Sequence, residues 1–273
     1  GFINYASALA ADKVFFNSEY HRRDFLKELV CFLKHFPDHN NLETVEKIAE
    51  KSAVLSLGLD LKRFDEYSFG NGRAGFETLN NRPTILWNHR WEYDKNPQEF
   101  FKALLMLSDK GLDFGVAVLG ECFGQQPDEF RVAKEKLGDK VVHFGYAENF
   151  ADYAKWLWQA DILPVTSKQD FFGASVVEAI YCDCLPILPS RLTYPELLPT
   201  RFHSRCLYEN FDDLLRRLEN AILSFPDLPR QSLRKSVGKF SWSQLAPAYD
   251  KAFEDICAAN LEERPDLSVV LNE

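Results

Sequence analysis

The chain has 273 residues, a formal net charge of −9 and 46% hydrophobic residues, a composition too apolar for a disordered protein and typical of a soluble cytoplasmic one. The acidic balance excludes a general electrostatic attraction for nucleic acid. No apolar run approaches the length of a membrane span, and no signal peptide is visible. We therefore predict a cytoplasmic location without stable membrane insertion.

The first 64 residues alternate helical and strand patterns. We predict a helix through about Ala11, a strand over 13–16, a helix from Glu19, another helix to about Lys51, a strand over 53–57 and a turn over 58–64. This order is that of an αβα unit of a sheet domain. Because the chain starts at Gly1 inside a helical pattern rather than with Met, we expect a preceding amino-terminal part that this sequence lacks.

A glycine- and asparagine-rich stretch over 65–82 is predicted to be a linker. From 83 to 240 strand and helix patterns alternate, with strands expected over 84–88, 114–119, 141–144, 162–165, 185–188 and 205–208. Such alternation indicates an α/β domain with a parallel sheet, which binds ligands beyond the carboxyl ends of its strands. A last helix is predicted over 241–258 and a loose tail over 259–273.

The cysteines and a spaced histidine pair do not predict a metal site. Six cysteines are scattered without C-x-x-C spacing, so reduced core thiols are expected. His35 and His39 have metal-pair spacing, but Pro37 between them argues against a continuous helix. Two basic clusters could contact an anionic partner locally, although solvated helix faces are the commoner explanation: Arg201, His203 and Arg205, and Arg230, Arg234, Lys235 and Lys239.

The candidate ligand site centres on two carboxylates, Asp170 and Glu178, which enclose Phe172, Gly173 and Ala174. A short buried strand precedes them and helical spacing begins at Ala174, so Gly173 falls at a strand-to-helix turn. Backbone N–H groups at such a helix start attract phosphate, and the carboxylates can accept hydrogen bonds from sugar hydroxyls. The stretch therefore predicts a nucleotide-sugar site.

Two cations follow the first strand of the predicted sheet. Arg90 and Lys95 precede Pro97, which is placed where a helix would begin. A planar fork of donors and a flexible point charge suit a diphosphate held at two separate oxygens. The alternative is a solvated loop with one capping contact, because arginine and lysine are common in loops.

Two glycines are expected at the same edge of the sheet. Gly120 and Gly145 each follow a predicted strand, where a glycine permits close backbone approach and a nucleotide base could pack. They could equally be residues that make tight turns between strand and helix. The tryptophans are most simply core or interface residues: Trp87, Trp91, Trp156 and Trp158.

The series of Arg90, Lys95, Gly145 and the stretch 170–178 resembles the carboxyl-terminal domain of retaining GT-B glycosyltransferases of family 4. The resemblance implies a Rossmann-like carboxyl-terminal domain at 83–240, the end of an amino-terminal Rossmann-like domain at 1–64 and a helix at 241–258 that crosses back to it. It assigns the family's roles as follows: diphosphate binding to Arg90 and Lys95, backbone support of sugar and phosphate to Phe172 and Gly173, sugar-hydroxyl binding to Asp170, and ribose binding to Glu178.

Two positions depart from the family pattern. Asp170 stands where Glu is usual and is one methylene shorter, so the contact to the donor sugar, and with it the choice of sugar, is expected to differ. Asp183 lies near a position where glycine is common, so a differently built turn is expected. The residues to which catalysis is assigned remain Arg90, Lys95 and Asp170, with Gly120, Gly145, Phe172, Gly173, Ala174 and Glu178 added for donor binding.

Three longer strings, at 32–39, 86–97 and 192–197, are similar to the tRNA-queuosine α-mannosyltransferase group. This similarity implies transfer of mannose from GDP-mannose, with retention, onto queuosine in tRNA. Arg90, Lys95 and the helix start at Gly173 would oppose the charge growing on the diphosphate, so no cofactor or metal is expected. Two alternatives stay open, a family 4 enzyme with a lipid or polysaccharide acceptor and a non-catalytic nucleotide-sugar-binding module. The oligomeric state is also open.

Overall fold

The computed structural model describes residues 1–36, 38, 40–68, 82–122, 127–225 and 233–262. Its contacts divide the chain into a first unit, Gly1–Gly58 with Trp242–Glu273, and a second unit, Leu59–Ser241. The predicted boundary lay further along the chain, in a linker over 65–82. Residues 59–64 join the second unit because Leu61 and Phe64, in the 3₁₀ helix η1 (Leu61–Tyr67), are buried in its core. Residues 69–81 of the predicted linker lie outside the described residues.

In its described part, the first unit packs helices around two parallel strands. It contains α1 (Phe2–Ala10), β1 (Val14–Phe16), α2 (Glu19–Leu33), α3 (Glu43–Glu50), β2 (Ser52–Val54) and α12 (Trp242–Glu262). Helix α2 begins where the sequence predicts, because the Ser18 hydroxyl accepts a hydrogen bond from the backbone N–H of His21. A small core of Tyr5, Ala8, Leu29, Leu33 and Ile48 holds α1, α2 and α3 together.

Two predicted limits in this unit differ from the structure. Strand β2 ends at Val54 rather than at residue 57, because its partner β1 ends at Phe16, whose carbonyl accepts a last hydrogen bond from Leu55 N–H at 2.9 Å. Helix α12 continues to Glu262, so the first residues of the predicted tail are helical. Residues 263–273 lie outside the described residues.

The described part of the second unit is a six-stranded, all-parallel sheet in the order β5-β4-β3-β6-β7-β8. The strands are β3 (Thr84–Trp87), β4 (Gly115–Val118), β5 (Val141–Phe144), β6 (Ile162–Pro164), β7 (Leu185–Pro189) and β8 (Leu207–Tyr208). Counted within the unit, this order is 3-2-1-4-5-6, the Rossmann order. The predicted α/β fold with a parallel sheet is therefore confirmed.

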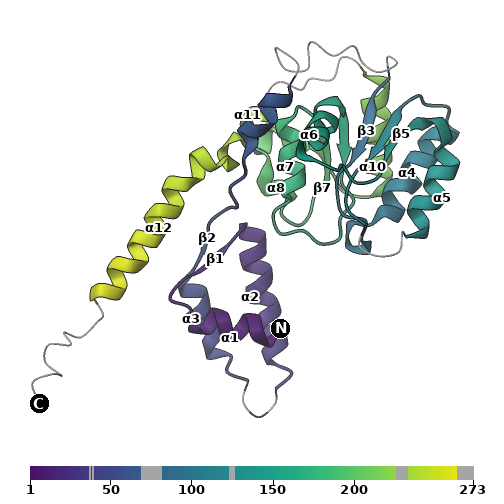
Figure 1. The fold of residues 1–273 in the computed structure, drawn as a ribbon. Coiled ribbons are helices and arrows are strands. Elements are labelled where there is room, and N and C mark those ends of the chain that lie inside the picture. Colours follow the sequence, from purple (N-terminus) through teal and green to yellow (C-terminus); the bar gives the residue numbers. More distant parts are fainter. Residues whose placement is uncertain (37, 39, 69–81, 123–126, 226–232, 263–273) are drawn as a thin grey trace, which may run out of the picture. The chain divides into compact units, whose positions relative to one another are not determined.

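Helices cover both faces of this sheet (Figure 1). On one face α4 (Pro97–Asp109) packs against α5 (Asp128–Leu137) and α10 (Phe211–Leu223), and on the other α7 (Ala174–Tyr181) packs against α6 (Phe150–Gln159) and α11 (Leu233–Val237). The central strands are buried on both sides and are apolar except for Thr84. Pro97 is the first residue of α4, as predicted. The short helices are α8 (Tyr194–Leu197), α9 (His203–Cys206), η4 (Tyr93–Lys95), η5 (Gly138–Lys140), η6 (Thr200–Phe202) and η7 (Gly238–Phe240).

The two halves of the sheet meet at β3 and β6. Ile85 pairs with Ile162, and the buried Asp161 adds two hydrogen bonds to Thr84. Its carboxylate accepts from Thr84 N–H at 2.8 Å, and its own N–H donates to the Thr84 carbonyl at 2.8 Å. These contacts join residues 77 positions apart in the chain.

The last predicted strand is shorter than expected. Residues 205 and 206 belong to α9, and β8 contains only Leu207 and Tyr208. The Arg217 guanidinium donates to the carbonyls of Ser204 and Arg205, which satisfies the end of the helical turn and delays the strand.

The turn at Asp183 keeps the geometry that glycine normally supplies. Asp183 has a φ of +66°, in the left-handed region that aspartate tolerates better than most residues and that glycine adopts freely. A turn built differently from that of the family stays a prediction. Beside Asp183, Cys182 and Cys184 are buried core thiols, as is Cys206, whereas Cys31 and Cys257 are exposed.

Candidate functional site

The strand order of the second unit reverses between β3 and β6, so the helices that follow these two strands lie on opposite faces. A crevice forms at such a point, beyond the carboxyl ends of the strands. The loops after β3, β4, β5 and β6 and helix α7 carry every predicted site residue: Arg90, Lys95, Gly120, Gly145, Asp170, Phe172, Gly173, Ala174 and Glu178.

A cavity of about 450 Å³ opens at this edge. Of the predicted residues, Arg90, Gly120 and Glu178 line it. Tyr146 and Tyr153 complete part of its wall from the β5 loop and α6. Its size is that of a small-molecule site, and its lining combines a cation, carboxylates and aromatic rings.

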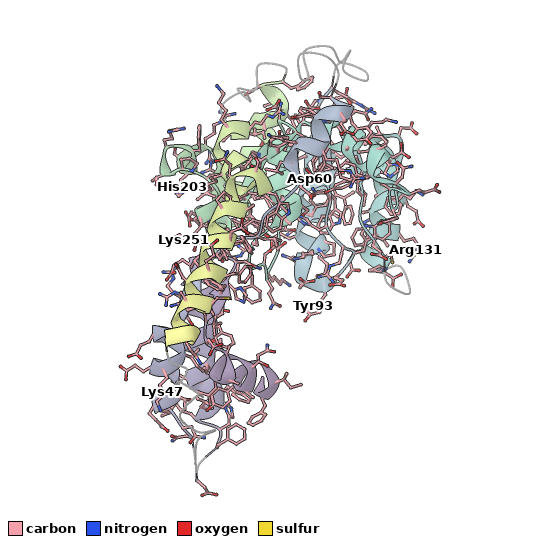
Figure 2. The ribbon with its side chains drawn as sticks, turned by 60° about the vertical axis from the view of Figure 1, so that its left-hand side comes forward. Lys47, Asp60, Tyr93, Arg131, His203 and Lys251 are labelled. Carbon is pink, nitrogen blue, oxygen red and sulfur yellow. The ribbon has the colours of Figure 1, made fainter. Side chains whose placement is uncertain are left out.

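Arg90 is free to reorient toward a ligand. Its side chain is 52% exposed, and its Nη1 donates to the Glu92 carboxylate at 2.8 Å. An ion pair this exposed contributes little to stability. Tyr93, further along the same loop, projects into solvent (Figure 2). The guanidinium can therefore exchange Glu92 for an incoming anion at small cost.

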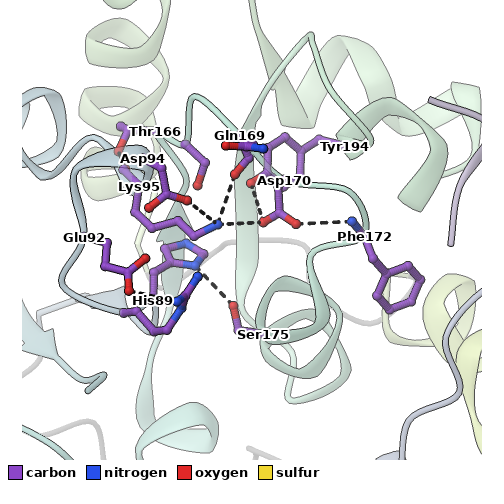
Figure 3. Close-up of polar contacts among 12 residues, drawn as sticks. His89, Glu92, Asp94, Lys95, Thr166, Gln169, Asp170, Phe172, Ser175 and Tyr194 are labelled. Carbon is purple, nitrogen blue, oxygen red and sulfur yellow. Dashed lines mark hydrogen bonds and ion pairs between the residues drawn. The ribbon is translucent and has the colours of Figure 1, made fainter. Parts of the chain in front are cut away.

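Lys95 is held more firmly by polar neighbours (Figure 3), and it is not among the residues that line the cavity. Its Nζ donates to the Gln169 carbonyl at 3.0 Å and forms ion pairs with Asp94 at 3.4 Å and Asp170 at 3.5 Å. The Thr166 hydroxyl donates to the Lys95 carbonyl at 2.9 Å. These contacts join the loop after β3 to the loop after β6 and hold the ammonium group between the two loops.

Asp170 is held by three donors of the protein itself. One carboxylate oxygen accepts from Phe172 N–H at 3.2 Å, and the other accepts from the Tyr194 hydroxyl at 3.1 Å and faces Lys95. Tyr194 is fully buried on α8. Hydrogen bonds from the following loop and from a neighbouring helix thus hold the Asp170 carboxylate in place (Figure 3).

Gly173 is the N-cap of α7, as the sequence predicts. Its φ is +82°, and its carbonyl accepts from Val176 and Val177 N–H at 3.0 Å. Ala174 is the first helical residue. The helix therefore begins at the carboxyl edge of the sheet, where the free backbone N–H groups of a helix start carry a partial positive charge.

Backbone geometry accounts for glycine at both predicted positions. Gly120 has a φ of +104°, and a Cβ there would lie 2.0 Å from the carbonyl oxygen of His89. Gly145 has a φ of +138°, and a Cβ there would meet no atom of the described residues within 4 Å. The β4 loop therefore approaches the β3 loop as closely as backbone allows. Packing of a base at these glycines stays a prediction.

His89 is a buried, uncharged side chain near Lys95. The ring is 4% exposed, and its Nδ1 lies 3.2 Å from the Ser175 hydroxyl. Burial, and then the Lys95 ammonium, lower the pKa of His89 from 6.5 to about 4. The imidazole is therefore uncharged at neutral pH.

His89 should make the protein acid-sensitive. Below pH 6.5 the unfolded chain takes up a proton at this histidine, whereas the folded protein does so only near pH 4, so stability falls as the pH falls through this window, by at most about 3 kcal/mol. His89→Gln should flatten that part of the profile, measured by urea unfolding from pH 8 to 4. If the free energy of unfolding, set equal for the two proteins at pH 8, falls equally steeply with pH in both, the acid sensitivity does not come from His89.

Glu178 lines the cavity and accepts a hydrogen bond from a tyrosine that lines it too. The Tyr153 hydroxyl donates to its Oε2 at 2.7 Å. Burial raises the pKa of Glu178, and the Tyr153 hydrogen bond opposes that rise. The carboxylate is a hydrogen-bond acceptor aimed at the same cavity as Arg90.

Sequence reasoning missed three of these residues. His89 and Tyr194 lie within strings that the family resemblance uses, at 86–97 and 192–197, but no role was assigned to them. Tyr153 carries no motif signal at all, because its partner is 25 residues away in the chain and only the packing of α6 against α7 brings them together.

Among the described residues, no three His, Cys, Asp or Glu side chains are grouped as a metal site, and each helix is too short or too polar to cross a bilayer. His39, the second residue of the spaced histidine pair, lies outside the described part of the chain. The predicted tryptophan positions are partly confirmed, since Trp87, Trp91 and Trp158 are buried in the core.

Two family models match the chain. Residues 1–59 match the amino-terminal model of tRNA-queuosine alpha-mannosyltransferase, and residues 73–233 match the model of glycosyl transferases group 1. The chain is 34% identical over 258 residues to the tRNA-queuosine alpha-mannosyltransferase of Drosophila melanogaster, covering 91% of the chain and 66% of that protein. It thus spans just under two thirds of that relative.

Solved structures share the fold. Sucrose-phosphate synthase from Thermosynechococcus elongatus superimposes with a TM-score of 0.69 at 18% identity, over 94% of this chain and 61% of that one. The Anabaena protein Alr3699/HepE, solved with UDP and glucose, gives a TM-score of 0.64 at 14% identity, over 91% of this chain and 64% of that one. At such identities the likeness establishes the fold alone.

Proposed function

Because the chain belongs to the group 1 glycosyltransferases, we propose that it transfers mannose from GDP-mannose, with retention of configuration, onto queuosine in a tRNA. The GT-B type of fold is shared with the solved relatives. The match of residues 1–59 and the similarity to the fly enzyme support the choice of mannose and of the queuosine acceptor. A tRNA acceptor also agrees with the predicted cytoplasmic location.

The observation that carries the proposal is the cavity at the carboxyl edge, lined by Arg90 and Glu178 and flanked by Lys95. We assign the ribose to Glu178, the diphosphate to Arg90 and Lys95, and the sugar to the side of Asp170. The nucleotide base would then lie toward Gly120, Gly145 and Tyr146. The Anabaena protein of the same fold, solved in complex with UDP and glucose, supports a donor of this class.

The chemistry of the transfer needs positive charge at the diphosphate. As the bond between sugar and phosphate breaks, negative charge grows on the leaving GDP. Arg90, Lys95 and the helix start at Gly173 are placed to oppose that charge, and charged donors fixed before the reaction lower the barrier most. We propose that they do so without a metal ion or other cofactor.

Transfer of labelled mannose tests the proposal directly. The protein is incubated with GDP-mannose and either tRNA that contains queuosine or the same tRNA lacking it. We expect label only in the queuosine tRNA, and GDP should bind at least about tenfold more tightly than UDP. Label recovered in lipid or polysaccharide would identify a different acceptor, and donor binding without transfer to any of the three would indicate a binding module.

A further inference from the structure

We infer that Tyr153 is a positioning residue that holds the Glu178 carboxylate toward the ribose of the donor nucleotide. The inference rests on the proposed function, since it takes the ligand of the cavity to be a nucleoside diphosphate. Tyr153 belongs to α6 and Glu178 to α7, and both line the cavity of about 450 Å³ that Arg90 also lines.

The hydroxyl of Tyr153 fixes one of the two carboxylate oxygens. At 2.7 Å from Oε2, it makes a short hydrogen bond to a charged acceptor, one of the stronger kinds in proteins. A glutamate side chain otherwise samples several rotamers at its χ3. With Oε2 engaged by the phenol, Oε1 remains for the neighbouring hydroxyls of a ribose.

The phenol itself is held in place by an aromatic cluster. Its ring lies 6.1 Å from Phe64 and 6.4 Å from Phe150, and these two rings pack edge to face at 4.9 Å. Phe64 is buried in the core. A ring fixed on these sides cannot follow the carboxylate, so the carboxylate takes the orientation that the phenol sets.

The hydrogen bond also keeps Glu178 a good acceptor. Burial raises the pKa of this carboxyl and the Tyr153 hydroxyl lowers it again. A buried carboxylate without that donor would bind a proton more readily and would offer the ribose a weaker acceptor. Orientation and charge state therefore both depend on one hydroxyl group.

Tyr153→Phe tests the inference because it removes only this hydroxyl. Affinities are measured by calorimetry for GDP and for 2′,3′-dideoxy-GDP, which lacks the ribose hydroxyls. We expect the unmodified protein to prefer GDP by about 30-fold, or about 2 kcal/mol, the usual contribution of one hydrogen bond to a charged group. The variant should prefer GDP by about threefold or less, through weaker binding of GDP and unchanged binding of the dideoxy nucleotide.

Tyr181→Phe is the matched control. Tyr181 lies on the same helix as Glu178, and its hydroxyl donates to a different carboxylate, that of Asp65, at 3.0 Å. This variant loses a tyrosine–carboxylate hydrogen bond outside the cavity and should keep the full preference for GDP. Tyr153→Met is measured beside Tyr153→Phe as a second variant without the hydroxyl, so that either folded variant decides the question.

A double variant shows whether Tyr153 acts through Glu178. In a Glu178→Ala background, Tyr153→Phe should change GDP affinity by less than about twofold, because the two positions share one interaction. In transfer assays Tyr153→Phe alone should raise the donor KM and leave kcat nearly unchanged, since the ribose is remote from the bond that breaks.

The outcomes separate the inference from the proposed function. An unchanged preference for GDP over the dideoxy nucleotide in a folded variant overturns the inference, and so does an equal loss of affinity for both nucleotides, which would mean that Tyr153 only supports the cavity wall. Failure of the unmodified protein to bind GDP would instead overturn the proposed function, and the inference with it.

Discussion

Lys95→Ala is expected to lower kcat/KM for the donor by about 10²- to 10³-fold, the usual cost of removing one fixed donor to developing negative charge. The Lys95 side chain is only 12% exposed and is oriented by Gln169, Asp94 and Asp170, so the ammonium needs little rearrangement to meet a diphosphate. Its removal also leaves Asp94 and Asp170 facing the site uncompensated. Two carboxylates would then repel the same phosphates.

The measurement pairs steady-state kinetics with GDP titration. Lys110→Ala is the matched control, because Lys110 is 46% exposed and pairs with Glu219 at 2.7 Å on the helical surface. That variant should retain near-normal kinetics and GDP affinity. Unchanged GDP affinity in Lys95→Ala would contradict the assignment of diphosphate binding to this lysine.

Gly120→Ala should destabilise the fold by about 3 kcal/mol or more, since the change forces both a clash and a strained backbone. The new Cβ would lie 2.0 Å from the carbonyl oxygen of His89, at a φ of +104°. The obstacle is backbone, which cannot swing aside as a side chain can. The β3 loop that carries Arg90 and Lys95 would have to move with it.

Gly111→Ala isolates the backbone contribution. Gly111 also has a positive φ, +81°, but in the described part of the chain nothing lies within 4 Å of a Cβ placed there. Its substitution should cost only about 1–2 kcal/mol, the penalty of a left-handed conformation for a residue with a Cβ. Urea unfolding of both variants checks the difference, and similar losses for the two would show that contact with His89 is not limiting.

Much of the second unit could be predicted because its strands carry a simple signal. Central strands such as β3 and β4 are buried on both faces and are therefore apolar except for Thr84. The ends of the elements depend on partners that the pattern does not reveal. Strand β2 stops where β1 stops supplying hydrogen bonds, and β8 starts late because Arg217 satisfies the carbonyls of a preceding helical turn.

The candidate site was predictable where charged residues or a glycine directly follow a strand of the sheet. Arg90, Lys95, Asp170 and Gly173 follow parallel strands, and parallel strands end at one edge of a sheet. The supporting residues could not be found in this way. Tyr194 and Tyr153 come from helices α8 and α6, and their hydroxyls reach Asp170 and Glu178 only after the helices have packed.

The seam between β3 and β6 also sets when the site can exist during folding. Thr84 and Asp161, joined across it, are 77 residues apart in the chain, and closing a loop of that length has an entropic cost that must precede the contact. Contacts of such long range slow folding. Lys95 thus meets Asp170 only once both halves of the sheet have formed and joined, so a partly folded chain lacks the complete site.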